Sequence, residues 1–198
     1  MQTPLVNESP QGFVIVVSGL PRSGTSMIMR MLEAGGFQLL TDNVRKPDTD
    51  NPGGYYEFEP VKRLASEHGW VAGAVGRVVK VISPLLPSLP AAYQYRVVFL
   101  QRDMREVLAS QRAMLVRRTQ TDGSAGDHRM GLLFSKHLRR IESWLSQQPN
   151  MEALYVPYTG VLENPQAAAI RLTRFLGREA DTTAMARVVD TSLYRQRV

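Results

Sequence analysis

The sequence of 198 residues contains no cysteine, which excludes disulfide bonds, catalytic thiolates and thiolate metal ligands. Histidine is also scarce: the three present, His68, His128 and His137, do not stand at the spacing of metal ligands, so no dedicated metal site is predicted. No apolar run approaches the ~20 residues that a membrane-spanning helix requires. The first residues lack the basic and apolar segments of a secretory signal. We therefore expect a cytoplasmic protein without a transmembrane segment.

The sequence also lacks a block of consecutive positive charges, although it is basic as a whole. It has 24 Lys and Arg against 18 Asp and Glu, a net charge of +6 and an isoelectric point near 9.9. The basic residues are scattered, and aromatic residues are not interleaved with them as in a nucleic-acid groove. This pattern favours a multiply charged small anion as the ligand over nucleic acid or a membrane surface. The length fits a single domain over residues 1–198, with residues 1–11 expected to be flexible and a homo-oligomer left open.

What the sequence does contain is a regular alternation of β-branched apolar runs and segments of helical periodicity. Strands are predicted over residues 12–19, 77–82, 96–101 and 152–158. Helices are predicted over residues 23–36, 59–74, 103–118, 129–148, 163–177 and 181–189. This alternation is typical of an α/β fold, a three-layer αβα arrangement around a central parallel sheet. Ligands of such sheets bind at the carboxyl ends of the strands, so the loops after residues 18, 82 and 101 are expected to converge.

The stretch "VIVVSGLPRSGTSMIMRML" (14–32) has the layout of a phosphate-binding loop between a strand and a helix. Gly19 and Gly24 have the separation of the Walker pattern G-x-x-x-x-G-K-[ST], but Thr25 occupies the place of the lysine. The loop therefore lacks the cation that bridges the β- and γ-phosphates of a triphosphate. Its amides and the helix N-terminus can still hold an anion, and Arg22 offers a planar cation for bidentate binding. The loop suits a 5′ phosphate that carries one further anionic group better than Mg-triphosphate; a plain strand-to-helix turn is the alternative.

This loop resembles the first signature of the sulfotransferases that use 3′-phosphoadenosine-5′-phosphosulfate (PAPS). The hexapeptide "PRSGTS" (21–26) matches the signature P-[KR]-S-G-T-[TS] at each position. The resemblance implies that the loop holds the 5′ phosphosulfate and that its arginine contacts the bridging oxygen. The loop residues that it assigns to donor binding are Arg22, Ser23, Gly24, Thr25 and Ser26.

The second signature of the same family is an arginine and a serine eight positions apart, on a strand end and the following helix. The stretch "RDMREVLAS" supplies Arg102 and Ser110 at that spacing. The resemblance implies that these two residues bind the 3′ phosphate of the donor. The alternative for Arg102 alone is an ion pair with Glu106, four residues further along the helix.

A third stretch, "YVPYTGVLENPQAAAIRLTRFLG" (155–177), resembles the tyrosine-containing loop and the following helix of these enzymes. There Tyr158 would approach the adenine. The resemblance covers residues 13–177 and implies a phosphate-binding-loop fold with PAPS as donor and 3′,5′-ADP as product. It further implies a hydroxyl or amine acceptor, on a small molecule, a glycan or a lipid, and no required metal.

The sequence departs from the family where the general base would stand. In cytosolic members a strand ends in K-T-H, and the histidine is the base; here "RVVKVISP" keeps Lys80 but has Ile82 in place of the histidine. Lys80 and Arg22 are expected to stabilise the charge that develops on the bridging and sulfonyl oxygens. The alternative is that Lys80 merely extends along the strand edge towards solvent.

A carboxylate can replace the missing histidine, as it does in other branches of the family. The stretch "GGYYEFEP" offers Glu57 and Glu59 beside aromatic residues that shield a carboxylate from water and so favour its use as a base. Glu57 is the leading candidate; the alternative is that Glu59 caps the next helix and Glu57 is solvated. His68 is a second candidate, with a structural role in its helix as the alternative. The predicted catalytic residues are therefore Arg22, Lys80 and Glu57.

The C-terminal part departs from the family as well. Longer members place an R-K-G segment over the 3′ phosphate, and this sequence has none. Arg195 and Arg197 are candidate substitutes, with a solvated basic tail as the alternative. The polar loop 119–128 is a candidate lid over the acceptor.

Two other function classes stay open at this point. A nucleotide kinase or NTPase with a degenerate loop would need Mg-ATP, yet the sequence lacks both the Walker lysine and a clear magnesium carboxylate. Asp103 follows the strand "VVFLQR", but it is better placed to cap the next helix. The third class is a catalytically silent nucleotide-binding protein on the same fold.

Overall fold

The computed structural model describes residues 12–42, 44–48, 51–119 and 127–194. The predicted flexible segment 1–11, the tail arginines Arg195 and Arg197 and most of the proposed lid loop lie outside these described residues.

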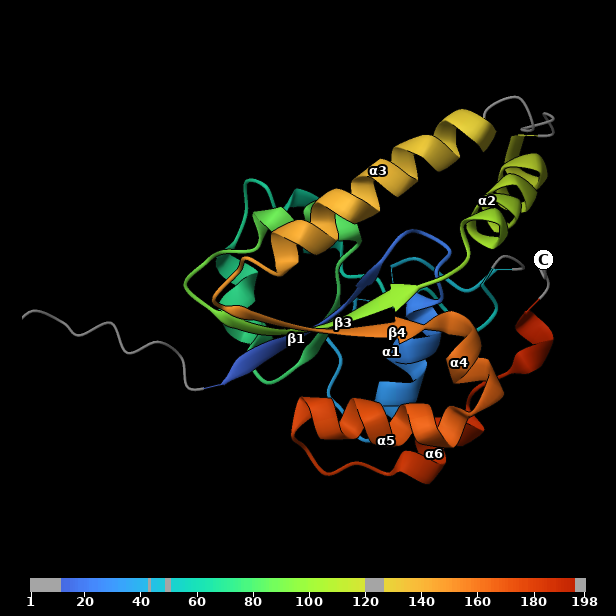
Figure 1. Cartoon of the computed structure of the whole chain (residues 1–198). Coiled ribbons are helices and arrows are strands. Elements are labelled where there is room, and N and C mark those ends of the chain that lie inside the picture. The colour runs from blue at the N-terminus through green and yellow to red at the C-terminus, as the bar shows by residue number, and fades with distance from the viewer. Residues whose placement is uncertain (1–11, 43, 49–50, 120–126, 195–198) are drawn as a thin grey trace, which may run out of the picture.

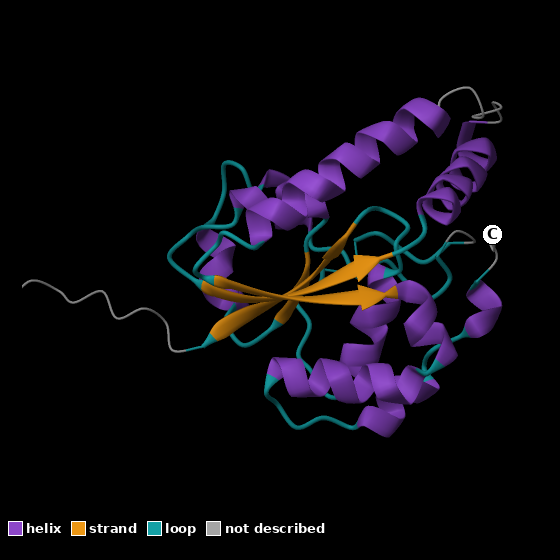
Figure 2. Ribbon diagram, in the orientation of Figure 1, coloured by secondary structure: helices purple, strands orange, loops and turns teal. Residues whose placement is uncertain are grey.

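Four parallel strands form one sheet in the order β2-β1-β3-β4. The strands are β1 (Phe13–Gly19), β2 (Val78–Lys80), β3 (Gln94–Gln101) and β4 (Met151–Pro157). β1 lies in the interior of the sheet, where Val17 pairs with Lys80 of β2 and with Val98 of β3. The predicted central parallel sheet is confirmed, and each strand agrees with its sequence-based range to within a few residues (Figure 2).

Helices cover both faces of the sheet, which gives the predicted three-layer α/β architecture (Figure 1). One face carries α1 (Thr25–Ala34), α4 (Tyr158–Glu163), α5 (Pro165–Leu176) and α6 (Thr182–Arg187). The other face carries α2 (Met104–Thr119), α3 (Asp127–Leu145) and the 3₁₀ helix η3 (Ser83–Ser88). The C-terminal 3₁₀ helix η5 (Thr191–Leu193) follows α6, and Tyr194 directly after it packs against the apolar cluster on the α1 face.

The buried strand β1 shows why its residues form a strand between two layers. Val14 and Val16 point into one apolar cluster, and Ile15 and Val17 point into the other, so the side chains alternate between the two faces. All four are fully buried, as expected for a strand of a parallel sheet that is covered on both sides.

The prediction of one helix over residues 59–74 is wrong. The segment forms two 3₁₀ helices, η1 (Glu59–Arg63) and η2 (Gly69–Ala74), separated by a turn. Gly69 and Gly73 weaken a continuous α-helix, because glycine loses about 1 kcal/mol relative to alanine at a helical position. Short i→i+3 turns still bury Val61 and Val71, which gave the segment its helical periodicity.

The remaining helices differ from their predicted ranges mainly at their ends. α3 begins at Asp127, inside the segment predicted as a loop, and Tyr158 begins the short helix α4 instead of ending a strand. Asp103 accepts a hydrogen bond from the amide of Arg105 at 2.8 Å, so its predicted role as a cap of α2 is confirmed. None of the helices within the described ranges is long and apolar enough to cross a membrane.

Candidate functional site

A cavity of about 630 Å³ opens at the carboxyl ends of β1, β2 and β3. Its wall includes Arg22 after β1, Ile82 after β2 and Arg102 after β3. The predicted convergence of these three loops is therefore confirmed. This edge of a doubly covered parallel sheet is the usual ligand site of the architecture.

The loop between β1 and α1 forms one wall of the cavity. Gly24 precedes α1 at φ +101°, and a Cβ atom there would lie 2.5 Å from Cδ2 of Tyr158, so the position requires glycine on both counts. Among the described residues, no side chain caps the N-terminus of α1, whose first residues Thr25 and Ser26 line the cavity. Uncapped amides at a helix start are an anion-binding arrangement. The side chain of Ser23 is buried instead, and its hydroxyl has no hydrogen-bond partner within the part of the chain that the structure describes.

Arg22 connects the two sites that the sequence predicted separately. Its backbone is in the left-handed region at φ +70°, and its Nε donates to Oγ of Ser110 at 3.0 Å. Arg102 donates in turn from its NH1 to the carbonyl oxygen of Arg22 at 3.0 Å. The loop arginine and the predicted 3′-phosphate residues thus form one cluster, in which Ser110 and Arg102 come from α2 and the end of β3.

The predicted alternative for Arg102, an ion pair with Glu106, is also present. Nε of Arg102 lies 2.9 Å from Oε2 of Glu106, and both side chains are nearly inaccessible to water, at 7% and 4% exposure. Tyr158 lies over the same guanidinium, with its ring centroid 4.3 Å from the guanidinium carbon. Burial raises the pKa of Tyr158. Arg102 is therefore a buried, oriented cation at the wall of the cavity, and the pair does not lie on the surface.

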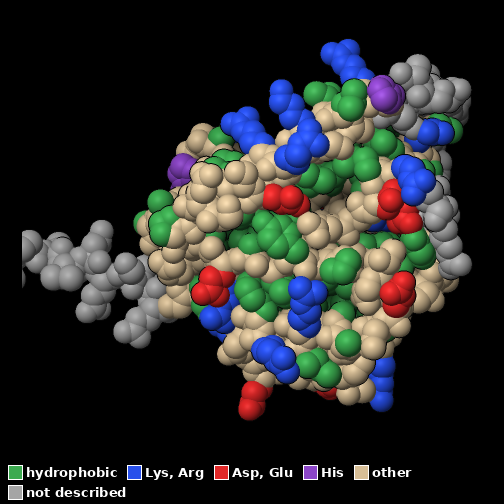
Figure 3. All heavy atoms as spheres, in the orientation of Figure 1, with side chains coloured by type: hydrophobic (Ala, Val, Ile, Leu, Met, Phe, Trp, Pro, Cys, Tyr) green, Lys and Arg blue, Asp and Glu red, His purple; other side chains and the backbone are tan. Residues whose placement is uncertain are grey.

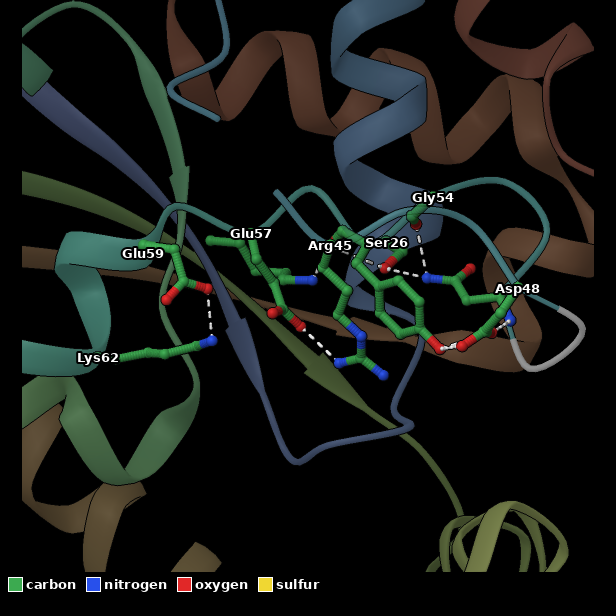
Figure 4. Close-up of polar contacts among 10 residues, drawn as sticks. Ser26, Arg45, Asp48, Gly54, Glu57, Glu59 and Lys62 are labelled. Carbon is green, nitrogen blue, oxygen red and sulfur yellow. Dashed lines mark hydrogen bonds and ion pairs between the residues drawn. The ribbon is translucent and has the colours of Figure 1, made fainter. Parts of the chain in front are cut away.

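Glu57 and Lys80 lie at another wall of the cavity, with Arg45 beside them. Oε1 of Glu57 is 2.9 Å from NH1 of Arg45, and Figure 4 shows the two side chains pointing towards each other. Nζ of Lys80 donates to the carbonyl oxygen of Tyr55. Burial lowers the pKa of Lys80 to about 8; nearby Glu57 opposes this shift and Arg45 adds to it. Lys80 is thus a shielded cation, which differs from a lysine that extends to solvent.

The segment around Asn51 holds the loop that carries Glu57 against α1. Nδ2 of Asn51 donates to Oγ of Ser26 at 3.0 Å and to the carbonyl oxygen of Gly54 at 2.5 Å (Figure 4). The phenol of Tyr55 donates to the carboxylate of Asp48 at 2.7 Å. These contacts join the hydroxyl of Ser26, at the start of α1, to the segment that carries Glu57.

The other two candidate bases, Glu59 and His68, lie away from the cavity wall, as do the remaining histidines, His128 and His137. Glu59 pairs with Lys62 at 2.5 Å, as the dashed line in Figure 4 shows. His68 is exposed at the start of η2, and His128 is exposed on α3. His137 is half-buried, and its Nε2 lies 2.9 Å from Oγ of Ser83; burial, with Arg140 nearby, lowers the pKa of this histidine. None of these four residues lines the cavity.

The charge of the cavity wall is strongly positive. Six Lys and Arg side chains line it against two acidic ones, Glu57 and Asp190. On the face shown in Figure 3, by contrast, Lys and Arg side chains are spread along α3 and over the lower layer. The cavity therefore suits a ligand with several negative charges. Within the described part of the chain, no group of three acidic or histidine residues could hold a metal ion.

Part of the cavity lining is apolar. Phe58 and Val61 from the η1 region, Leu85 from η3 and Met114 from α2 form it, together with Ile82. Ile82 is 38% exposed although it is a large apolar residue. The position at which the resemblance led us to expect a histidine thus contributes apolar surface here.

Several residues of the site could not be identified from the sequence. Arg45 and Asn51 stand in a segment without periodicity, which gave no reason to choose them. Glu106 was predictable only as an ion-pair partner through its i+4 spacing to Arg102. Tyr194 lies in the C-terminal segment, and no pattern in the sequence indicated that it contacts Glu106.

Known proteins that are similar in sequence pattern or in fold show the family of this chain. Residues 14–196 match the model of the "Sulfotransferase domain" family. The fold is similar to that of sulfotransferase STF1 from Mycobacterium tuberculosis, with a TM-score of 0.59 and 18% identity over 92% of this chain and 73% of that one. It is also similar to mouse sulfotransferase SULT7A1 in complex with PAP, with a TM-score of 0.56 and 18% identity over 91% of this chain and 63% of that one. No match to the sequence was found among curated proteins.

Proposed function

Since this chain belongs to the sulfotransferase domain family, we propose that it transfers the sulfonyl group of PAPS to a hydroxyl or amine of an acceptor. The observation that carries the proposal is the cluster of Arg22, Arg102 and Ser110 at the wall of the positive cavity. A donor with phosphates at both the 5′ and the 3′ positions needs two anion sites within reach of one nucleoside. The cluster and the adjoining helix N-terminus supply them.

The donor would lie across the edge of the sheet, over the carboxyl ends of the adjacent strands β1 and β3. The amides of residues 23–26 and the guanidinium of Arg22 would hold the 5′ phosphosulfate, with Gly24 allowing close approach. Arg102 and Ser110 would hold the 3′ phosphate, and Tyr158 would lie near the adenine. The complex of the mouse enzyme with PAP, the desulfated donor, supports this choice of nucleotide.

The reaction would be an in-line displacement at sulfur. The acceptor oxygen or nitrogen forms a bond to sulfur while the bond from sulfur to the bridging oxygen breaks, and 3′,5′-ADP leaves with the negative charge. Arg22 and Lys80 would stabilise that charge. Glu57 would take the acceptor proton, since its carboxylate lines the cavity beside Lys80.

The acceptor would be a small molecule, or the exposed part of a glycan or lipid, with an apolar portion next to its nucleophile. The apolar part of the cavity lining, including Ile82 and Met114, supports an acceptor of this kind. Transfer requires no metal in this scheme, because the leaving group is neutralised by arginine and lysine.

Nucleotide binding tests the proposal directly. We expect 3′,5′-ADP to raise the melting temperature of the protein more than AMP does at equal concentration, without magnesium. A magnesium-dependent response to ATP that exceeds the response to 3′,5′-ADP would instead favour a kinase or NTPase. If 3′,5′-ADP binds but PAPS is not consumed with any of a broad set of phenols, alcohols and amines, the protein is a silent member of the family.

The pKa of Lys80 near 8 predicts a pH-dependent affinity for the donor product. The free protein loses the positive charge of Lys80 as the pH rises through about 8, whereas a bound anion favours the protonated lysine. The Kd for 3′,5′-ADP should therefore increase above pH 8, by up to about tenfold per pH unit, with proton uptake on binding. Titration calorimetry in buffers of different ionisation enthalpy measures both quantities.

Lys80→Met is the control for this pH dependence. It should bind 3′,5′-ADP more weakly and with little change in affinity between pH 7 and 9. An unchanged slope in this variant would show that another group titrates. The charge of the 3′ phosphate itself changes little over this range, because its second pKa of about 6 leaves roughly nine-tenths of it ionised at pH 7.

A further inference from the structure

Glu106 is a buried carboxylate paired with Arg102 of the cavity wall, and the proposed reaction does not use it. The residue is 3% exposed and lies in the first turn of α2. Its Oε2 accepts from Nε of Arg102 at 2.9 Å, and its Oε1 accepts from the phenol of Tyr194. Both oxygens of the carboxylate therefore have a donor, and the second donor comes from the C-terminal segment, 88 residues away in the sequence.

Tyr194 also contacts the other groups that surround Arg102. Its ring centroid lies 5.5 Å from that of Tyr158 at an interplanar angle of 72°, and 5.6 Å from the guanidinium carbon of Arg102. Tyr158 lies over the same guanidinium at 4.3 Å. The carbonyl of Arg22 accepts from NH1 of Arg102. The guanidinium is thus held by a carboxylate, a carbonyl and two aromatic rings.

We propose that Tyr194, acting through Glu106, positions Arg102 so that the cavity discriminates nucleotides with a 3′ phosphate from those without one. The inference rests on the proposed function, because it assumes that Arg102 binds that phosphate. It makes the C-terminal segment a part of the donor site, in a chain that lacks the R-K-G segment of longer family members.

The electrostatic reason is the position of Glu106 next to the expected phosphate. A buried carboxylate repels a phosphate dianion, and the repulsion is reduced when hydrogen bonds satisfy its oxygens. Without the phenol, Oε1 would have no donor from Tyr194 and would compete with the phosphate for the guanidinium. The hydrogen bond to Glu106 raises the pKa of Tyr194, so the phenol stays a donor throughout the neutral range.

Tyr194→Phe tests the proposal, because it removes the hydroxyl and keeps the ring. We expect the Kd for 3′,5′-ADP to rise about five- to fiftyfold, less than for the direct loss of a hydrogen bond to a charged group because Tyr194 acts through Glu106, while the Kd for AMP stays within about twofold. The readout is the ratio of the two dissociation constants at one pH and salt concentration. If the role of Tyr194 were purely structural, the variant would bind both nucleotides more weakly by the same factor, and the ratio would stay unchanged.

Tyr56→Phe is the matched control. The phenol of Tyr56 donates to Oε2 of Glu33 at 2.9 Å, so the variant also removes a tyrosine–glutamate hydrogen bond, but neither residue lines the cavity. It should leave the ratio unchanged. The melting temperatures of both variants establish that they fold.

The outcomes separate this inference from the proposed function. If the wild-type protein binds 3′,5′-ADP no more tightly than AMP, the donor assignment fails. If the wild type discriminates and Tyr194→Phe discriminates equally well, the donor assignment stands and the role of Tyr194 is refuted. If Tyr194→Phe no longer discriminates 3′,5′-ADP from AMP and Tyr56→Phe still does, the result supports both the donor assignment and the role of Tyr194.

Discussion

Replacing Arg102 by glutamine is expected to raise the Kd for 3′,5′-ADP by about a hundred- to ten-thousandfold, while AMP binding changes little. The guanidinium can donate two charge-assisted hydrogen bonds to one phosphate, each worth about 1.5–3 kcal/mol, and glutamine supplies no charge. Calorimetric titration with the two nucleotides measures the difference. Because Arg102 is the direct 3′-phosphate ligand in the proposal, this effect should exceed that of Tyr194→Phe.

A second variant separates binding from folding in this experiment. Removing Arg102 alone leaves the buried Glu106 without its counter-charge, which costs about 3–5 kcal/mol of stability. Arg102→Gln combined with Glu106→Gln removes both charges, so it should melt at a higher temperature than the single variant. It should still fail to prefer 3′,5′-ADP over AMP. A double variant that keeps the preference would refute the assignment of Arg102.

Glu57→Gln is expected to lower the turnover number by about a hundred- to ten-thousandfold, the usual contribution of a general base. The amide cannot accept the acceptor proton, although it keeps the shape of the side chain. Binding of 3′,5′-ADP should change by less than about threefold, since Glu57 is not assigned to the nucleotide. The turnover number is measured from steady-state rates with PAPS and an acceptor that the wild type sulfonates. The Kd for 3′,5′-ADP is measured by titration calorimetry.

Glu59→Gln is the comparison for this effect. Glu59 is two residues away and also ion-paired, but it does not line the cavity. It should retain turnover within about threefold of the wild type. A large loss of turnover in Glu59→Gln and none in Glu57→Gln would identify Glu59 as the base instead. No loss in either variant would exclude both carboxylates as the base.

The sequence was sufficient to predict the layers of the fold because local signals agreed with the tertiary structure. β1 is a continuous apolar run, and α5 begins at Pro165 after an asparagine cap and ends before Gly177 at φ +62°. The prediction of one helix over residues 59–74 failed because the apolar spacing of this segment is helical, whereas its glycines and short turns favour 3₁₀ geometry. Periodicity reports which side chains are buried, and it does not distinguish an α-helix from successive 3₁₀ turns.

The site was predictable only where a motif fixes the spacing. "PRSGTS" and the Arg102–Ser110 pair could be found from the sequence, and the structure places Arg22, Arg102 and Ser110 at one cavity. The contact between Arg22 and Ser110 spans 88 positions, and no local pattern encodes it. The same holds for Tyr194, whose distance from Glu106 depends on how α5, α6 and the following segment return to the sheet.

The neighbouring positions of β1 and β3 have a mechanical consequence. Gly19 pairs with Leu100 in the sheet, so the loop that carries Arg22 and the strand end that carries Arg102 leave from adjacent strands, about 5 Å apart. α1 then continues on one face and α2 on the other (Figure 1). The backbone hydrogen bonds between these strands therefore fix the separation of the points from which the two segments leave the sheet. Nucleotide capture should accordingly need no hinge closure, and its entropic cost should fall mainly on the side chains.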